Sequence, residues 1–154
     1  MNKLIKLGAV ALFSFFVVAC NKADPAADLK KLTDWQVAQT QSQMAFQQEF
    51  QQKMATQDPA QIDAAVKDFG AKVAEIQKGL DALDIKSEEI KGLKDKMKAA
   101  LVLSNELVLD SVKVMQNPTE EAQKAILDKT QKVMQAQQDL VKLQSELQAK
   151  YPAK

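Results

Sequence analysis

The sequence predicts an all-α fold, an up-down-up-down four-helix bundle that follows a cleaved signal peptide. Hydrophobic residues make up 46% of the 154 residues, the aromatic fraction is 5%, and there are only four Gly and four Pro. Such a composition favours long helices over a sheet sandwich. Three short breaks divide the chain beyond its N-terminal region into four segments, near residues 26–57, 59–83, 87–116 and 118–150. Short breaks make consecutive helices antiparallel neighbours.

Residues 1–19 have the layout of a secretory signal peptide. Lys3 and Lys6 form a positively charged region, and the apolar run LGAVALFSFFVV follows it. This run is too short to span a bilayer, for which about 20 residues are needed. It leads into the tetrapeptide VVAC, which ends in Cys20, the only cysteine of the chain.

The VVAC tetrapeptide resembles the lipobox of bacterial lipoproteins. The resemblance implies that residues 1–19 are removed and that Cys20 is lipidated on its thiol and, usually, on its new amino group. Palmitate and similar chains would then anchor the protein, since two or three chains bind a membrane far more firmly than one. In the enteric sorting rule Asp after the cysteine retains a lipoprotein at the inner membrane. Asn21 stands there, so the resemblance implies the outer membrane and leaves open which side the domain faces.

We expect residues 20–27 to form the lipidated cysteine and a tether, and residues 28–154 to form the helical bundle domain. Asp24-Pro25 is a candidate helix start within the tether, because Asp is a good capping residue and Pro suits the first helical position. The same device occurs at two of the breaks: Asp58-Pro59 and Asn117-Pro118.

Apolar periodicity predicts helices in the last three segments. In 59–83 the apolar seam consists of Ile62, Val66, Phe69, Val73, Ile76, Leu80 and Leu83. Segment 87–116 carries an apolar face that Val102 and Val112 broaden, so we expect it to be the most buried helix. Segment 118–150 shows adjacent apolar pairs at seven-residue spacing, which are Ile126/Leu127, Val133/Met134 and Leu140/Val141.

Segment 26–57 has a weaker pattern and is rich in glutamine. Leu32, Trp35, Phe46 and Phe50 share one face of a helix, whereas Val37 and Met44 fall on nearly the opposite face. Nine Gln lie from Gln36 to Gln57, and Gln is a good helix former without charge. We therefore expect a helix that is either a loosely packed bundle member or a partner-binding element. The possible partner face comprises Trp35, Val37, Met44, Phe46 and Phe50.

The order of the helices also resembles the periplasmic b-type cytochrome bundles. PAQIDAAVKDF at 59–69 opens one helix, and the last helix ends in QAKYP at 148–152. That family binds haem through a Met near the start of its first helix and a His in its last helix. This chain has no His, which excludes His-ligated haem. The resemblance therefore implies the scaffold without the cofactor, and Met44 and Met54 are expected to fill gaps in packing.

The composition offers few groups for catalysis. There is no His, and the one Cys is expected to be lipidated, so the usual general base, transition-metal ligand and thiol nucleophile are missing. We expect no catalytic residue, no cofactor and no metal site. The 21 basic residues are all Lys and nearly balance 20 acidic ones. A nearly neutral chain without Arg is a poor candidate for nucleic-acid binding.

These observations lead us to expect a non-catalytic envelope lipoprotein, anchored in a membrane through lipid on Cys20. It would act as a protein-interaction or structural module for an envelope protein that the sequence does not identify. One alternative is a periplasmic chaperone or stress adaptor that binds clients through the Gln-rich first helix, which an exposed groove at Val37, Met44 and Met54 would favour. Another is a carrier of a small ligand or lipid between the helices. The oligomeric state stays open.

Overall fold

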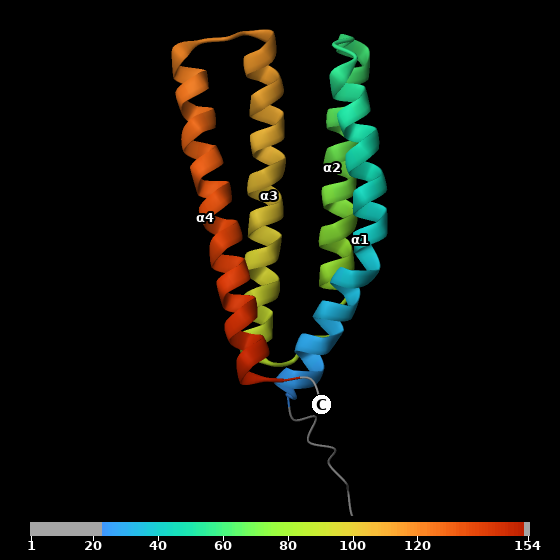
Figure 1. The fold of residues 1–154 in the computed structure, drawn as a ribbon, viewed down its shortest axis with the longest axis vertical. Coiled ribbons are helices and arrows are strands. Elements are labelled where there is room, and N and C mark those ends of the chain that lie inside the picture. Colours follow the sequence, from blue (N-terminus) through green and yellow to red (C-terminus); the bar gives the residue numbers. More distant parts are fainter. Residues whose placement is uncertain (1–22, 153–154) are drawn as a thin grey trace, which may run out of the picture.

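The structure, a computed structural model, describes residues 23–152 (Figure 1). Within this range the chain forms four α-helices and no strand. They are α1 (Pro25–Ala55), α2 (Pro59–Asp81), α3 (Glu88–Gln116) and α4 (Glu120–Lys150). The helices run alternately up and down, which confirms the predicted four-helix bundle. The end of the bundle where α1 begins and α4 ends is called the tether end, and the opposite end is called the distal end.

The starts of α1 and α2 follow the capping chemistry of the sequence. Asp24 Oδ1 accepts hydrogen bonds from the N–H groups of Ala26, at 3.1 Å, and Ala27, at 3.2 Å. Asp58 Oδ1 accepts one from the N–H of Ala60 at 3.0 Å. Such caps satisfy donors that the first helical turn leaves without partners. Residues 25–27, which the sequence pattern places in the tether, are therefore the first turn of α1.

The last helix begins two residues later than the sequence predicts. Thr119, rather than Asn117, caps α4, because the Thr119 hydroxyl accepts a hydrogen bond from the N–H of Ala122 at 3.1 Å. Pro118 accordingly lies in the connection and not in the helix. Asn117 instead ends α3, where its N–H donates to the carbonyl of Lys113.

The apolar core lies at the tether end and draws on all four helices and the α2–α3 connection. It comprises Leu29, Leu32, Ile76, Leu80, Ile85, Ile90, Leu93 and Leu147. Trp35 packs against this cluster and is half-buried. The Trp35 ring lies directly against the α2 backbone, since a Cβ atom added to Gly79 would be 3.0 Å from Cζ2 of the indole.

Toward the distal end the α1–α2 hairpin separates from the α3–α4 hairpin (Figure 1). α3 packs along both α2 and α4, but no comparable packing joins α1 to α4. The prediction that the third helix is the most buried agrees with the share of exposed residues, since 11 of the 29 residues of α3 are exposed, against 12 of 23 in α2. α3 nevertheless has three fully buried residues where α2 has four, and its Val102 and Met115 are exposed.

A pair of leucine substitutions tests where the core lies. Leu80 is fully buried at the tether end, whereas the Leu127 side chain in α4 is 65% exposed. Leu80→Ala should lower the free energy of unfolding by about 2–5 kcal/mol, since it leaves a cavity. Leu127→Ala should change it by less than about 0.5 kcal/mol. Urea unfolding followed by circular dichroism measures both, and equal losses would contradict this placement of the core.

Candidate functional site

Two neighbouring apolar pockets of about 410 Å³ each lie on the inner side of the α1–α2 hairpin, the first lined by that hairpin and by Leu101 of α3 and the second lined by all four helices. The first contains three aromatic side chains, Phe46, Phe50 and Phe69. The second lies nearer the tether end and is lined by residues such as Trp35, Gln36, Met97, Leu140, Val141 and Gln144. Gln43, Ile76 and Leu101 line both pockets. The two pockets therefore form one continuous surface, here called the inter-hairpin groove.

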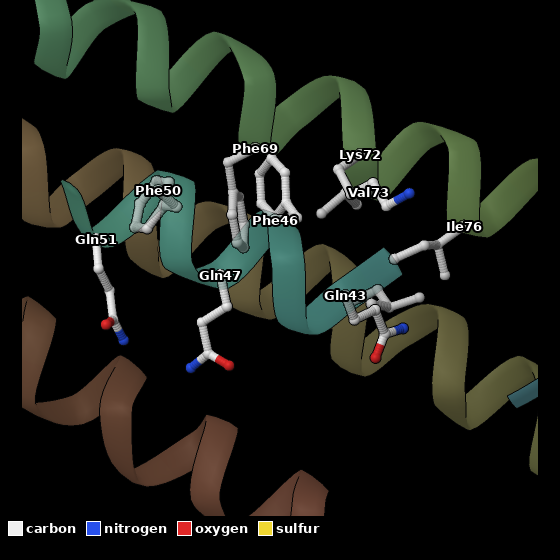
Figure 2. Close-up of a pocket in the computed structure, with 10 residues that line it drawn as sticks. Gln43, Phe46, Gln47, Phe50, Gln51, Phe69, Lys72, Val73 and Ile76 are labelled. Carbon is white, nitrogen blue, oxygen red and sulfur yellow. The ribbon is translucent and has the colours of Figure 1, made fainter. Parts of the chain in front are cut away.

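Three phenylalanines form one wall of the groove. The ring centroids of Phe46 and Phe50 lie 6.2 Å apart, and Phe69 of α2 lies 6.1 Å from the first and 5.3 Å from the second. Figure 2 shows these rings gathered between α1 and α2. At such distances aromatic rings attract one another beyond their area burial. All three remain only half-buried, so the cluster still offers an apolar surface to solvent.

A row of glutamines on α1 forms the polar edge of the groove. Gln43, Gln47 and Gln51 are spaced four residues apart, which places them on one side of the helix. All three line the first pocket, and in Figure 2 the last two extend away from the aromatic rings. Nearer the tether end Gln36 accepts a hydrogen bond from Nε2 of Gln144 in α4, at 3.1 Å. Uncharged amides therefore line the edge where α1 faces α4.

Lys72 is the one charged residue among those that line the two pockets. Its Nζ donates to Oγ of Ser42 at 2.8 Å and to Oε2 of Glu75 at 3.1 Å. The ammonium group thus has partners outside the groove. The groove presents apolar surface and neutral amides, with no cluster of charge.

One stripe of α4 carries large apolar side chains that nothing in the described chain covers. Leu127, Met134 and Val141 are 65%, 51% and 66% exposed, and they follow one another at seven-residue intervals. Val141 lines the second pocket, so the stripe continues the wall of the groove toward the distal end. The residue before each of the three is half-buried. Each apolar pair of the sequence is therefore divided between the packed side of α4 and the exposed stripe.

The structure does not bring the predicted partner face together as one surface. Trp35, Phe46 and Phe50 line the groove. Val37 and Met44 are 68% and 59% exposed and line neither pocket. The reason is the helical period, because these two residues lie on a side of α1 that faces neither α2 nor α3.

Sequence reasoning missed three parts of the groove: Phe69, Leu101 and the exposed stripe on α4. Phe69 belongs to the apolar seam of segment 59–83, whose regular spacing predicts that every member is buried in the core. In the structure Phe69 lines the first pocket instead. The adjacent apolar pairs of α4 could have indicated the stripe. One contact between two helices buries only one member of such a pair, so the second members, Leu127, Met134 and Val141, are additional apolar surface.

Asp28 joins the two hairpins at the tether end. Its side chain is almost fully buried, and Oδ2 accepts hydrogen bonds from the N–H groups of Lys86 and Ser87, both at 2.8 Å. Oδ1 pairs with Nζ of Lys31 at 3.2 Å. The Ser87 side chain makes no capping bond to α3, so Asp28 satisfies the start of that helix from across the chain. Burial alone would raise the pKa of Asp28, but these hydrogen bonds outweigh it and hold the pKa below 3.8.

A second contact at the tether end joins the start of α3 to the end of α4. Glu89 accepts hydrogen bonds from Nζ of Lys150 at 2.6 Å and from the hydroxyl of Tyr151 at 2.8 Å. These bonds lower the pKa of Glu89 below its usual 4.5. Both of these links between distant segments therefore lie at the same end as the core.

Residues 23–152 contain neither a candidate metal site nor a candidate membrane-spanning helix. No three side chains of the metal-binding types come together in this range. No helix within it combines the length and the apolar character that crossing a membrane requires.

Comparison with known proteins gave a match to a protein family. A family model described as "Uncharacterised lipoprotein PM1805" matches residues 26–152, which include nearly all of the four helices. No curated protein and no solved structure matches the chain. Cys20 and the predicted signal peptide lie outside the residues that the structure describes.

Removing the Asp28 charge should destabilise the fold in a pH-dependent way. The folded-state pKa lies below the ordinary value of 3.8, so the carboxylate contributes fully above that pH and stops contributing as the pH falls through the folded-state pKa. At pH 7, Asp28→Asn should cost about 1–3 kcal/mol in the free energy of unfolding. The difference from the wild type should shrink on acidification well below pH 3.8.

Asp34→Asn is the matched control for that experiment. Asp34 pairs with Lys30 on the surface and its side chain is 64% exposed, so its substitution should change stability by no more than about 0.5 kcal/mol. Urea unfolding at neutral and acid pH measures all three proteins. A difference between the wild type and Asp28→Asn that stays constant with pH would contradict the role given to the Asp28 carboxylate.

Proposed function

The chain belongs to the lipoprotein family of that description, and from this premise we propose that it is a non-catalytic binding protein of the cell envelope. Its helical domain would bind a partner protein in the inter-hairpin groove. The observation that carries the proposal is the apolar surface left uncovered between the hairpins, where Phe46, Phe50 and Phe69 are only half-buried and Val141 is exposed. Exposed apolar patches of this kind commonly mark interaction sites.

Membership of a lipoprotein family supports a membrane-anchored protein of the envelope. The finer assignment is part of the proposal. The signal peptide ends before Cys20, whose thiol carries the lipid, and Asn21 directs the protein to the outer membrane. Its support is the order of charged region, apolar run and cysteine in the first twenty residues.

The lining of the groove favours binding over catalysis. Apart from Lys72, its side chains are apolar, amide or hydroxyl groups. Proton transfer at neutral pH needs a group with a suitable pKa at the reacting atom, and neither pocket lining includes a carboxylate. Binding a partner protein requires only the apolar and amide surface that the groove provides.

The other two functions considered from the sequence have less support. A chaperone surface at Val37, Met44 and Met54 lacks a groove, because none of these three residues lines either pocket. A carrier would enclose its ligand, since ligand sites bury most of a small molecule's surface. The inter-hairpin groove instead leaves its lining residues accessible to solvent, since Val141 is 66% exposed and Phe46, Phe50 and Phe69 are only half-buried.

Metabolic labelling tests the anchor. Cells given an alkyne analogue of palmitate should label the wild-type protein, and Cys20→Ala should abolish the label because no other cysteine exists. Asn21→Asp should keep the label and move the protein from the outer-membrane to the inner-membrane fraction. Label that persists in Cys20→Ala would contradict lipidation at this residue, and an unchanged location of Asn21→Asp would contradict the sorting assignment.

Site-specific crosslinking tests the groove. A photo-reactive benzophenone residue placed at Val141 in cells should give a discrete adduct with a partner protein. The matched control is Val37, whose exposure of 68% is close to the 66% of Val141 but which lies outside the groove. Phe50→Ser in the same chain should reduce the Val141 adduct. Equal adducts from both valines, or none from Val141, would contradict binding in the groove.

A further inference from the structure

We infer, on the basis of the proposed function, that the occupant of the inter-hairpin groove is an amphipathic α-helix of a partner protein whose polar edge is uncharged. This helix lies along α4, on the side where a closed four-helix bundle would place α1. Three properties of the groove lead to this occupant: the spacing of its apolar residues, the neutrality of its edge and its position relative to the tether end.

The spacing of the exposed residues on α4 suits another helix. Leu127, Met134 and Val141 repeat every seven residues and are each more than half exposed. A seven-residue repeat keeps apolar side chains on the seam between two helices over several turns. An extended strand has a side-chain period of two and could not follow this stripe. The neighbour that α4 lacks is therefore a helix of about three heptads.

The polar edge of the groove determines the chemistry of that helix. On α1 the edge consists of Gln43, Gln47 and Gln51, and on α4 Gln137 and Gln144 line the second pocket. Amides both donate and accept hydrogen bonds, so they pair with Ser, Thr, Asn or Gln at a helix edge. A partner helix with charged residues at its edge would lose water around those charges and find no counter-charge in the groove. Lys72, the one charged lining residue, already pairs with Glu75.

The same neutrality counts against a phospholipid. Phosphate recognition relies on Lys, Arg or clustered backbone N–H groups, and the second pocket has no charged residue in its lining. Position adds to this argument. Leu127 lies 23 residues before the end of α4 at Lys150, which places it about 35 Å from the tether end at 1.5 Å per residue. Acyl chains of the bilayer that holds the tether therefore lie far from the distal part of the stripe.

The single tryptophan makes occupancy measurable in the intact domain. Trp35 is the only Trp of the chain and lines the second pocket together with Val141. The probe is a synthetic helical peptide of about three heptads, with Leu at the seam positions, Gln and Ser at the edges, and Lys only on the far face. The control peptide has the same composition, with its Leu residues distributed around the helix.

The amphipathic peptide should shift the Trp35 emission saturably, and the control peptide should not. Val141→Asn and Met134→Lys should each weaken binding by about tenfold or more, as is usual for a buried apolar anchor. Val37→Asn and Met44→Lys match them in residue type and closely in exposure but lie on α1, outside both the groove and the exposed stripe of α4, so they should leave the affinity unchanged. Circular dichroism confirms that all four variants fold.

The remaining outcomes overturn the inference. Equal weakening by the groove variants and their controls would show that the peptide binds elsewhere. Displacement of the peptide by palmitate or by phosphatidylcholine vesicles, with loss of that displacement in Val141→Asn, would assign the groove to a lipid. A doubled molecular mass in light scattering that Met134→Lys abolishes would assign it to a second copy.

Failure here is distinguishable from failure of the proposed function. If the peptide does not bind while the Val141 crosslink in cells persists, the groove binds a protein, but not through an amphipathic helix with an uncharged edge. If neither the peptide nor a crosslinked partner is found at Val141, both proposals are wrong.

Discussion

The buried carboxylate of Asp28 is the constraint on which the arrangement of the two hairpins depends. It connects the first turn of α1 to the N–H groups of Lys86 and Ser87 just before α3, so the two hairpins cannot move apart at that end without breaking both hydrogen bonds that Oδ2 accepts. The apolar core surrounds the same region. Because both the ionic link and the core lie at the tether end, nothing comparable holds the distal ends together.

The composition of α1 explains why the bundle stays open along α4. Closing the gap would press Gln43 and Gln47 of α1 onto the apolar stripe that includes Met134. An amide buried without hydrogen-bond partners loses its bonds to water, which costs about 1–3 kcal/mol. The free energy gained by burying the Met134 side chain against these amides would not exceed the cost of desolvating them. The open groove is therefore the expected result of placing glutamines where a closed bundle has aliphatic residues.

Local patterns sufficed for the helices and their up-down order but not for the separation of the two hairpins. The apolar seams and the capping pairs at Asp24 and Asp58 predicted three helical segments and two starts within a residue or two. At α4 the pair Asn117-Pro118 led to a predicted start two residues too early, because Thr119, which is also a good capping residue, caps the helix instead. Asp28 accepts its hydrogen bonds from Lys86 and Ser87, which lie 58 and 59 positions later in the chain. No local sequence pattern predicts a contact over that separation. Leu127 is exposed because α1 does not pack along α4. The relative position of these two helices is a property of the tertiary structure that local sequence patterns do not contain.

The close approach of Trp35 to Gly79 has a consequence for how such chains can diverge. Any side chain at position 79 would occupy space now filled by the indole, since its first carbon would already lie 3.0 Å from the ring. A larger residue there becomes acceptable only if a smaller one replaces the tryptophan. The two sites, one on each helix of the first hairpin, should therefore vary jointly across descendants of a common ancestor, and a change at one alone should be rare.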